Sequence, residues 1–483
     1  MRKSLLLCSA AALYLSLSAP SVRADDALLI GGGYNLQGSQ GQIELNVKWV
    51  QGILQAQGLS VSTYFTDGRE AGPDVHYMVD PSTQSSPLEA LARVFGDWGL
   101  ENRRYRENEV AEVLGSTRRN ELEPRLRQIF ERGEDEELLL VYNGHGSQSY
   151  TTPDEVTLNL WDDTTLSASE LHELLEPQRS AFRFVFTQCY SGGFHRLAYA
   201  DSAQGSELSE TPRCGFTAES AYRLAEGCSA SIDTDDYRDY TTFFFAALSG
   251  RERGGDIIGR DPDRNKDGTT TLREAHLYTL EEAYSTDLSR STSEDYLDQW
   301  QPWYLRWLPT SASLPDNEYA ALFRNLATRH DVALNDDTRN NLRQALADAD
   351  QALDSLAGER LSLEQQMQQL QYQLQYRLVG QWPELMGPYT AAYQKMAADG
   401  LLREIAEQTE RLPEYRQLQQ LQDRYASLDL DMLDRERQAT QYQKMIRLRR
   451  LAQLKQQLAE HGSVQEQADY QALLSCEEAP LTR

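Results

Sequence analysis

Residues 26 to about 310 alternate short apolar runs with longer segments in which apolar residues recur every three to four positions. Short apolar runs are typical of buried strands, and the longer spacing is typical of helices with one buried face. Strands are expected at residues 27–30, 59–65, 138–142, 157–161, 182–187 and 214–218. Helices are expected at residues 42–57, 120–132, 167–175 and 240–248. This alternation predicts an α/β fold, interrupted by a polar insertion or surface loop region at about 69–116.

The pattern changes after about residue 315. From Asn340 onward glutamine is frequent, and apolar residues alternate steps of four and three, as in a coiled coil. The stripe consists of Leu342, Leu346, Ala349, Leu353, Leu356, Leu363, Met367, Leu370 and Leu374. A break near 380–388 and further helical sequence beyond it predict an antiparallel hairpin or bundle. Its role stays open between oligomerisation or spacing and a prodomain or cap over the α/β domain.

The first 24 residues have the features of a secretory signal peptide. Arg2 and Lys3 precede an apolar run at 5–19, and small residues stand at the two positions that a signal peptidase reads. The run is too short to span a bilayer. We therefore expect cleavage after Ala24 and a periplasmic or secreted protein.

Length and charge narrow the classes of function. The 483 residues suffice for two or three domains at roughly 100–200 residues each. We divide them into a signal peptide at 1–24, an α/β domain at 25–312 and a helical coiled-coil domain at 313–483. The net charge is −27, and loss of the signal peptide with its three basic residues makes it −30. Phosphate backbones and anionic headgroups repel such a chain, so nucleic acid and membrane partners are not expected.

The five cysteines have different contexts. Cys8 lies in the signal peptide. Cys214 and Cys228 flank one short segment, and a disulfide between them would close a loop of about 15 residues and contribute about 3 kcal/mol. We expect this disulfide, and Cys476 has no evident partner. Cys189 instead ends a strongly apolar run and is followed by Tyr-Ser-Gly-Gly.

Two expected strands end in reactive side chains. The run at 138–142 leads into His145, and the run at 182–187 leads into Cys189. The carboxyl ends of neighbouring parallel strands share one crevice, so we expect the two side chains to face each other. An imidazole can take the proton of a thiol, which makes the pair a candidate base and nucleophile.

The residues around this pair suit acyl chemistry. The backbone N–H groups of Gly146 and Cys189 are the expected donors to a tetrahedral oxyanion. His195, six residues after the cysteine, is a rival base, but it lies in the helix expected after the nucleophile.

These blocks resemble the caspase and legumain clan of cysteine peptidases. The His145-Gly146 and Gln188-Cys189 blocks each follow an apolar strand in the order of the family, and residues 216–220 resemble its next strand. The resemblance covers roughly 25–310 and, with the signal peptide, leans toward secreted legumain-like or gingipain-like members. It implies a caspase-like, mostly parallel sheet flanked by helices. It also implies peptide-bond hydrolysis by Cys189 as nucleophile and His145 as base, without a cofactor for the chemistry.

Substrate preference carries over less directly. In legumain-like enzymes an acidic residue after the strand that corresponds to 214–218 helps to line the first specificity pocket. Asp233 lies in the acidic stretch 232–236, which follows that strand here. A carboxylate there would favour Arg, Lys or Asn before the cut. The alternative is that these aspartates cap the helix expected at 240–248 or remain solvated.

A second motif is independent of the dyad. Within residues 261–274, the twelve residues from Asp263 match an EF-hand-like calcium loop, with Gly268 at the sharp turn. The expected ligands are Asp263, Asn265, Asp267, the carbonyl of Thr269, and Glu274. Thr270 and the lack of an entering helix depart from the pattern, so a solvated Asp/Asn/Gly turn is the alternative.

Together these patterns predict a periplasmic or secreted, calcium-binding cysteine endopeptidase that acts on protein or peptide substrates. An inactive protease-like scaffold that works through its coiled coil is the alternative from another class, and a cysteine amidase or transpeptidase is a third hypothesis. The C-terminal helices are the expected surface for a homo-oligomer or another partner.

Overall fold

The computed structural model describes residues 27–79, 88–96, 102–132, 137–149, 152, 155–202, 207–227, 229–300, 302 and 314–481. The expected signal peptide at 1–24 lies outside these residues, as does Cys228. Every helix within the described ranges is too short or too polar to serve as a membrane-spanning segment.

A seven-stranded sheet, in the order β12-β11-β10-β6-β1-β2-β5, forms the centre of the N-terminal part. Its strands are β1 (Ala27–Gly32), β2 (Val61–Phe65), β5 (Val113–Gly115), β6 (Leu138–Gly144), β10 (Phe182–Phe186), β11 (Arg213–Thr217) and β12 (Arg290–Ser291). All neighbouring pairs are parallel except β11 and β12. The expected α/β class with a mostly parallel sheet is therefore confirmed.

Helices cover both faces of this sheet, because its buried strands point alternate apolar residues to opposite sides. Leu139 and Val141 pack with α1 (Gly41–Ala56), α5 (Tyr240–Ser249) and α6 (Leu272–Glu282). On the other face, Leu138 and Leu140 pack with helices that follow β5, β9 and β10. These are α3 (Arg119–Arg132), α4 (Ala168–Leu174) and the 3-10 helix η1 (Ser191–Ala198).

Smaller elements surround the carboxyl ends of the strands. A three-stranded antiparallel sheet consists of β7 (Gly146–Gln148), β8 (Val156–Leu160) and β9 (Thr164–Ser167). The polar region at 69–116 contains the hairpin of β3 (Val75–Met78) and β4 (Arg103–Arg106), and between these strands α2 (Glu89–Phe95). The same region supplies β5, which extends the main sheet at its edge.

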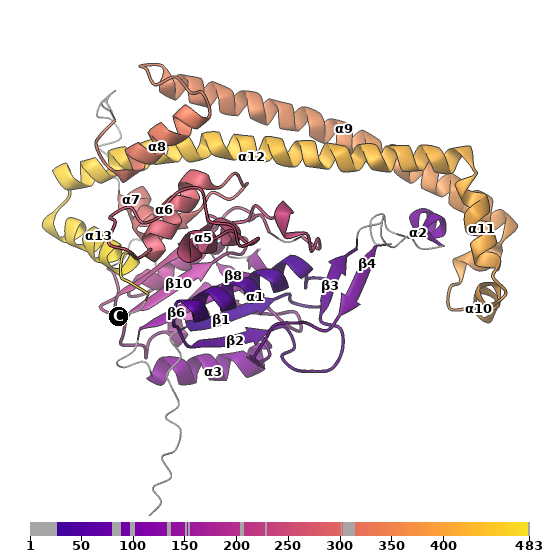
Figure 1. Cartoon of the computed structure of the whole chain (residues 1–483), viewed down its shortest axis with the longest axis horizontal. Coiled ribbons are helices and arrows are strands. Elements are labelled where there is room, and N and C mark those ends of the chain that lie inside the picture. The colour runs from indigo at the N-terminus through magenta and orange to yellow at the C-terminus, as the bar shows by residue number, and fades with distance from the viewer. Residues whose placement is uncertain are drawn as a thin grey trace, which may run out of the picture.

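The C-terminal part is helical. It contains α8 (Glu318–Arg329), α9 (Thr338–Gln381), α10 (Ala391–Ala398), α11 (Leu401–Glu410), α12 (Pro413–His461) and α13 (Val464–Glu477), after α7 (Thr292–Trp300). Helices α9 and α12 run side by side in opposite directions along the α/β part (Figure 1). Leu363, Met367, Leu370 and Leu374 of the predicted stripe are buried in this pair.

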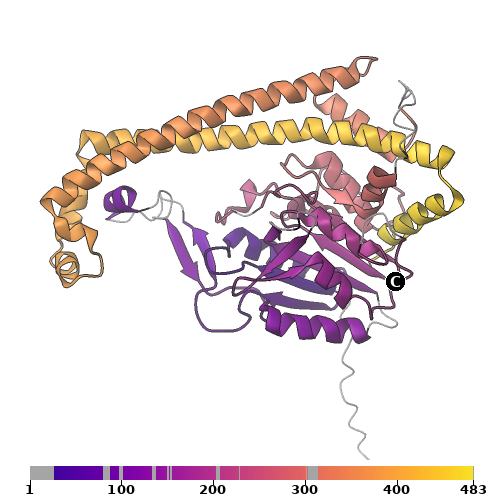
Figure 2. The ribbon, with the colours of Figure 1, turned by 180° about the vertical axis from the view of Figure 1, so that it is seen from behind.

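The helical extension contacts the N-terminal part at both ends. At its distal end α2 packs against α9, α11 and α12, as both views show (Figures 1 and 2). There Gln371 Nε2 donates to the carbonyl of Arg93 at 3.0 Å, and Arg93 Nη1 donates to Gln422 Oε1 at 2.9 Å. At the other end α12 is followed by α13, which packs against β11, the neighbour of the edge strand β12.

The predicted disulfide is wrong. Cys214 of β11 pairs with Cys476 of α13, 262 residues away, and their Cα atoms lie 6.1 Å apart, within the normal range for a disulfide. The local pairing of Cys214 with Cys228 was based on their closeness in the sequence. Cys476 reaches Cys214 because α13 packs against β11.

Candidate active site

His145 and Cys189 lie at the carboxyl ends of neighbouring strands. The register pairs Tyr142 of β6 with Phe186 of β10. His145 comes three residues after Tyr142, and Cys189 comes three residues after Phe186. This placement at one end of two neighbouring strands is the one expected from the sequence for parallel strands.

The two segments touch through their backbones. A Cβ added to Gly146 would lie 2.3 Å from the carbonyl oxygen of Cys189 and 2.6 Å from Cγ of Gln188. Such distances exclude any side chain, so glycine at this position is what lets the histidine loop lie against the cysteine turn. The structure thus brings His145-Gly146 and Gln188-Cys189 together.

The ring of His145 is oriented by the loop after β1. Its Nε2 lies 2.8 Å from the carbonyl oxygen of Gly38 and 2.8 Å from Oε1 of Gln40. Both neighbours are acceptors, so Nε2 carries the proton and Nδ1 is the nitrogen that can take another. Burial lowers the pKa of His145, which favours the neutral imidazole that a general base requires.

Cys189 is half-buried beneath residues 223–226. The backbone N–H of Ala225 donates to its Sγ at 3.3 Å. Burial raises the pKa of the thiol, the contact with Ala225 lowers it, and the nearby carboxylates of Asp287 and Glu219 raise it further. The net pKa lies above the ordinary 9.0, so the resting thiol is protonated and needs a base.

Two buried carboxylates near the thiol were missed by the sequence analysis. Glu219 accepts from the backbone N–H of Leu288 at 2.8 Å, and Asp287 accepts from those of Glu226 and Tyr240 at 2.6 and 2.7 Å. They connect the loop after β11 to the loop before β12 and to α5. Glu219 lies within residues 216–220, the segment that resembles the next strand of the family, so its position could have been noticed in the sequence. The sequence around Asp287 contains no comparable motif.

The rival base His195 faces away from this arrangement. It is buried in η1, its Nε2 lies 3.2 Å from the hydroxyl of Thr217, and its Nδ1 lies 3.7 Å from the carboxylate of Asp295. These partners belong to the packing between η1, β11 and α7. They account for a buried histidine without a role in catalysis.

Asp233 is exposed and caps a short turn. Its carboxylate accepts from the backbone N–H of Asp235 at 3.1 Å at the start of the 3-10 turn η2 (Thr234–Asp236). Asp239 stands at the start of the helix that follows, and its carboxylate accepts from the hydroxyl of Thr242 at 2.6 Å. Asp239 is buried and also accepts from Nδ2 of Asn46 at 2.8 Å. A role of Asp233 in specificity stays a prediction.

The expected calcium loop curls around its own carboxylates. Asp263 accepts from the backbone N–H groups of Lys266 and Gly268 at 2.6 and 2.8 Å, and Gly268 has a φ of +92°. Glu274 accepts from the backbone N–H of Arg264 at 2.9 Å and forms a capping box with Thr271 at the start of α6. Glu274 thus joins both ends of the loop, as a closing calcium ligand must.

The contacts within the loop also bring the middle ligands together. Nδ2 of Asn265 donates to Asp267 at 2.9 Å, and the N–H of Asp267 lies 3.3 Å from the carboxylate of Asp263. Within the described ranges, however, no group of three or more His, Cys, Asp or Glu side chains is arranged to hold a metal ion. The oxygen-rich donor set fits calcium by chemistry, and its role as a ligand set stays a prediction.

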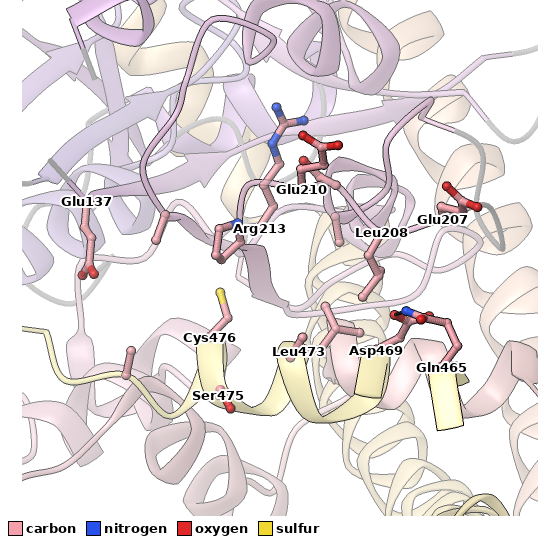
Figure 3. A pocket seen from close by; sticks show the side chains of 16 residues that line it. Glu137, Glu207, Leu208, Glu210, Arg213, Gln465, Asp469, Leu473, Ser475 and Cys476 are labelled. Atoms are coloured by element: carbon pink, nitrogen blue, oxygen red, sulfur yellow. Dashed lines mark hydrogen bonds between the residues drawn. The ribbon is translucent and has the colours of Figure 1, made fainter. Parts of the chain in front are cut away.

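A separate cavity lies at the other end of the sheet, where β11 begins. It has a volume of about 780 Å³ and is lined by the start of β11 and by α13, including Arg213, Leu473 and Cys476. In Figure 3 the sulfur of Cys476 points from α13 toward the start of this strand. Arg213 begins β11, whereas Cys189 follows the far end of the neighbouring parallel strand β10. The cavity is therefore separate from the candidate active site.

The arrangement at Cys189 can support thiol-based acyl chemistry. It combines a protonated thiol with a neutral imidazole whose proton is held on Nε2. Proteins of one fold class catalyse many different reactions, so the evidence for acyl chemistry comes from the residues of the site. Comparison with the profiles of known protein families and with curated proteins gives no match to this sequence.

Proposed function

We propose that the protein is a periplasmic or secreted cysteine endopeptidase of the caspase and legumain type. The observation that carries this proposal is the contact between the two blocks, in which Gly146 lies against the carbonyl of Cys189 at the ends of β6 and β10. A nucleophile and base pair also requires a group that orients the base. Gly38 and Gln40 supply it, because their oxygens bind Nε2 of His145.

The first half of the proposed reaction forms an acyl-enzyme. Nδ1 of His145 takes the proton from Sγ of Cys189, and the thiolate attacks the carbonyl carbon of the scissile peptide bond. The N–H groups of Gly146 and Cys189 donate to the oxyanion of the tetrahedral intermediate. The imidazolium then returns the proton to the nitrogen of the leaving amine, and the C–N bond breaks.

The second half releases the acyl group. Neutral His145 takes a proton from a water molecule, and the hydroxide attacks the thioester. The thioester C–S bond breaks, Sγ regains its proton from the imidazolium, and a carboxylic acid leaves. Calcium, if it binds the loop at 263–274, supplies charge neutralisation and rigidity beside α6 and takes part in none of these steps.

The test of this function is a library of peptides that differ in the residue before each bond. We expect internal cuts, with Arg, Lys or Asn preferred before the cut, because the region around the site carries several carboxylates and the chain is strongly acidic. Product analysis by mass spectrometry identifies the cut bonds. Removal of terminal amides or formation of new peptide bonds, in place of internal cuts, would indicate an amidase or a transpeptidase.

Calcium is expected to stabilise the folded chain. At a hundred times its dissociation constant the ion should raise the free energy of unfolding by about 2.7 kcal/mol, and chelation should remove this gain. The measurement is the melting temperature with calcium and with a chelator, for the unaltered protein and for Asp263→Asn. Asp261→Asn is the matched control, because Asp261 lies outside the five ligand positions. A melting temperature that chelation leaves unchanged would contradict calcium binding.

A further inference from the structure

The segment at 223–226 is fastened to the turn that carries the candidate nucleophile. The backbone N–H of Tyr190 donates to the carbonyl of Arg223 at 2.9 Å. Two residues further on, the N–H of Ala225 donates to Sγ of Cys189 at 3.3 Å. The position of this segment therefore determines both how far the sulfur is covered and whether it has a hydrogen-bond donor.

The other side of the same segment is held by α12 of the helical extension. Arg437 forms an ion pair with Glu226, in which Nε lies 3.1 Å from Oε1. The side chains of this pair are only 17% and 13% exposed. Arg223 reaches the same helix, because its Nη1 donates to Oε1 of Gln443 at 2.6 Å. The residues that flank Ala225 are thus anchored on a helix more than 200 positions later in the chain.

The neighbouring loop that leads to β12 rests on the same face of α12. Nζ of the buried Lys444 donates to the carbonyl of Ala283 at 2.8 Å, and the hydroxyl of Tyr284 donates to Asp434 at 3.0 Å. This loop continues into Asp287, whose carboxylate accepts from the N–H of Glu226. Both loops that face the sulfur are therefore supported by one helix.

We infer that Arg437 is a positioning residue for the cysteine chemistry: its ion pair with Glu226 holds the N–H of Ala225 against Sγ of Cys189. The helical extension is then a structural part of the catalytic centre. This inference rests on the proposed function, and it assigns α12 a task that neither oligomerisation nor spacing would require. The acidic side chains near the sulfur are Asp287 and Glu219, and Arg437 pairs with the carboxylate of Glu226, the residue that follows Ala225.

The test compares Arg437→Gln with the matched control Arg435→Gln. Arg435 lies on the same helix but is exposed and bonds only to Gln438 among the contacts that the structure gives. We expect Arg437→Gln to lower kcat for a cleaved peptide by about tenfold to a hundredfold, because small displacements at a reacting centre have effects of that size. KM should change by less than about threefold, since the substrate surface is retained. Alkylation of Cys189 by iodoacetamide should become faster, because the sulfur is less covered.

Three further variants separate positioning from a general loss of structure. Arg437→Lys keeps the charge and should recover part of kcat. Glu226→Gln and the double variant with Arg437→Gln complete a double-mutant cycle, in which the double variant should be no slower than the slower single variant. Gln443→Leu removes the contact with Arg223 without a change of charge, and it should also lower kcat. This variant replaces Arg437→Gln in the test if Arg437→Gln fails to fold. Equal melting temperatures for Arg437→Gln and Arg435→Gln establish that the folded states are compared.

The outcomes distinguish this inference from the proposed function. Peptide hydrolysis by the unaltered protein together with unchanged kcat and unchanged alkylation in Arg437→Gln would overturn the positioning role alone. A double-mutant cycle with additive effects would also overturn it. If the unaltered protein cuts no peptide, the proposed function fails, while faster alkylation in folded Arg437→Gln would still show that the ion pair controls access to the sulfur.

Discussion

Replacement of Cys189 by alanine is expected to abolish peptide hydrolysis while the protein stays folded. Loss of the nucleophile in an enzyme of this type lowers kcat by about a millionfold, because no other group can form the acyl intermediate. The structural effect is small, since the substitution removes one half-buried sulfur and its weak contacts with the backbone of Ala225. A lost hydrogen bond of this kind costs about 1 kcal/mol. The measurement combines peptide cleavage with a thermal melt.

His145→Asn should also strongly lower peptide hydrolysis, because an amide cannot take the thiol proton. Cys228→Ser is the control for replacement of a different cysteine and should keep full activity. Hydrolysis that persists unchanged in Cys189→Ala would rule out the proposed mechanism. Absence of hydrolysis from every variant, including the unaltered protein, would favour the scaffold hypothesis, in which the α9–α12 pair is the functional part.

Replacement of Cys476 by serine is expected to produce the largest loss of stability. The disulfide between Cys214 and Cys476 joins residues 262 positions apart, and closure of so long a loop in the unfolded chain corresponds to about 5 kcal/mol in the chain-entropy description. The bond also holds α13 on the edge of the sheet at β11, so its loss should loosen the connection between the helical extension and the α/β part. The measurement is denaturant unfolding of the oxidised protein and of Cys476→Ser.

Cys228→Ser discriminates between the two pairings of Cys214. It should unfold at the same denaturant concentration as the unaltered protein, because the structure pairs Cys214 with Cys476. A strong loss of stability in Cys228→Ser, with none in Cys476→Ser, would restore the local pairing that the sequence suggested. Peptide mapping without reduction gives the same decision directly.

Much of the sheet could be predicted because its strands are buried on both faces. Runs such as 138–142 and 182–187 are apolar at nearly every position, and they form β6 and β10 within one or two residues of the expected limits. The same property located the candidate nucleophile and base, since reactive residues at the carboxyl ends of parallel strands share one edge. The antiparallel course of α9 and α12 agrees with the hairpin expected from the break at about 380–388 between successive helical segments.

The features that were missed depend on contacts between segments far apart in the chain. Gly38 and Gln40 orient His145 from a loop more than 100 residues earlier, and no motif marks them. Asp287 comes close to the sulfur only because its loop packs between α5 and α12. Each contact consists of one or two hydrogen bonds, which leave no periodic pattern in the sequence.

The sequence by itself determined the α/β class, the long helical extension and the positions of His145 and Cys189, because hydrophobic periodicity and strand ends are local properties. Only the tertiary structure decided the partner of Cys214, the contact of Gly146 with Cys189, and the support of Glu226 by Arg437. These three contacts depend on which surfaces the helices bury against the sheet. That arrangement is determined by the total free energy of packing over the whole molecule, which no local sequence pattern records.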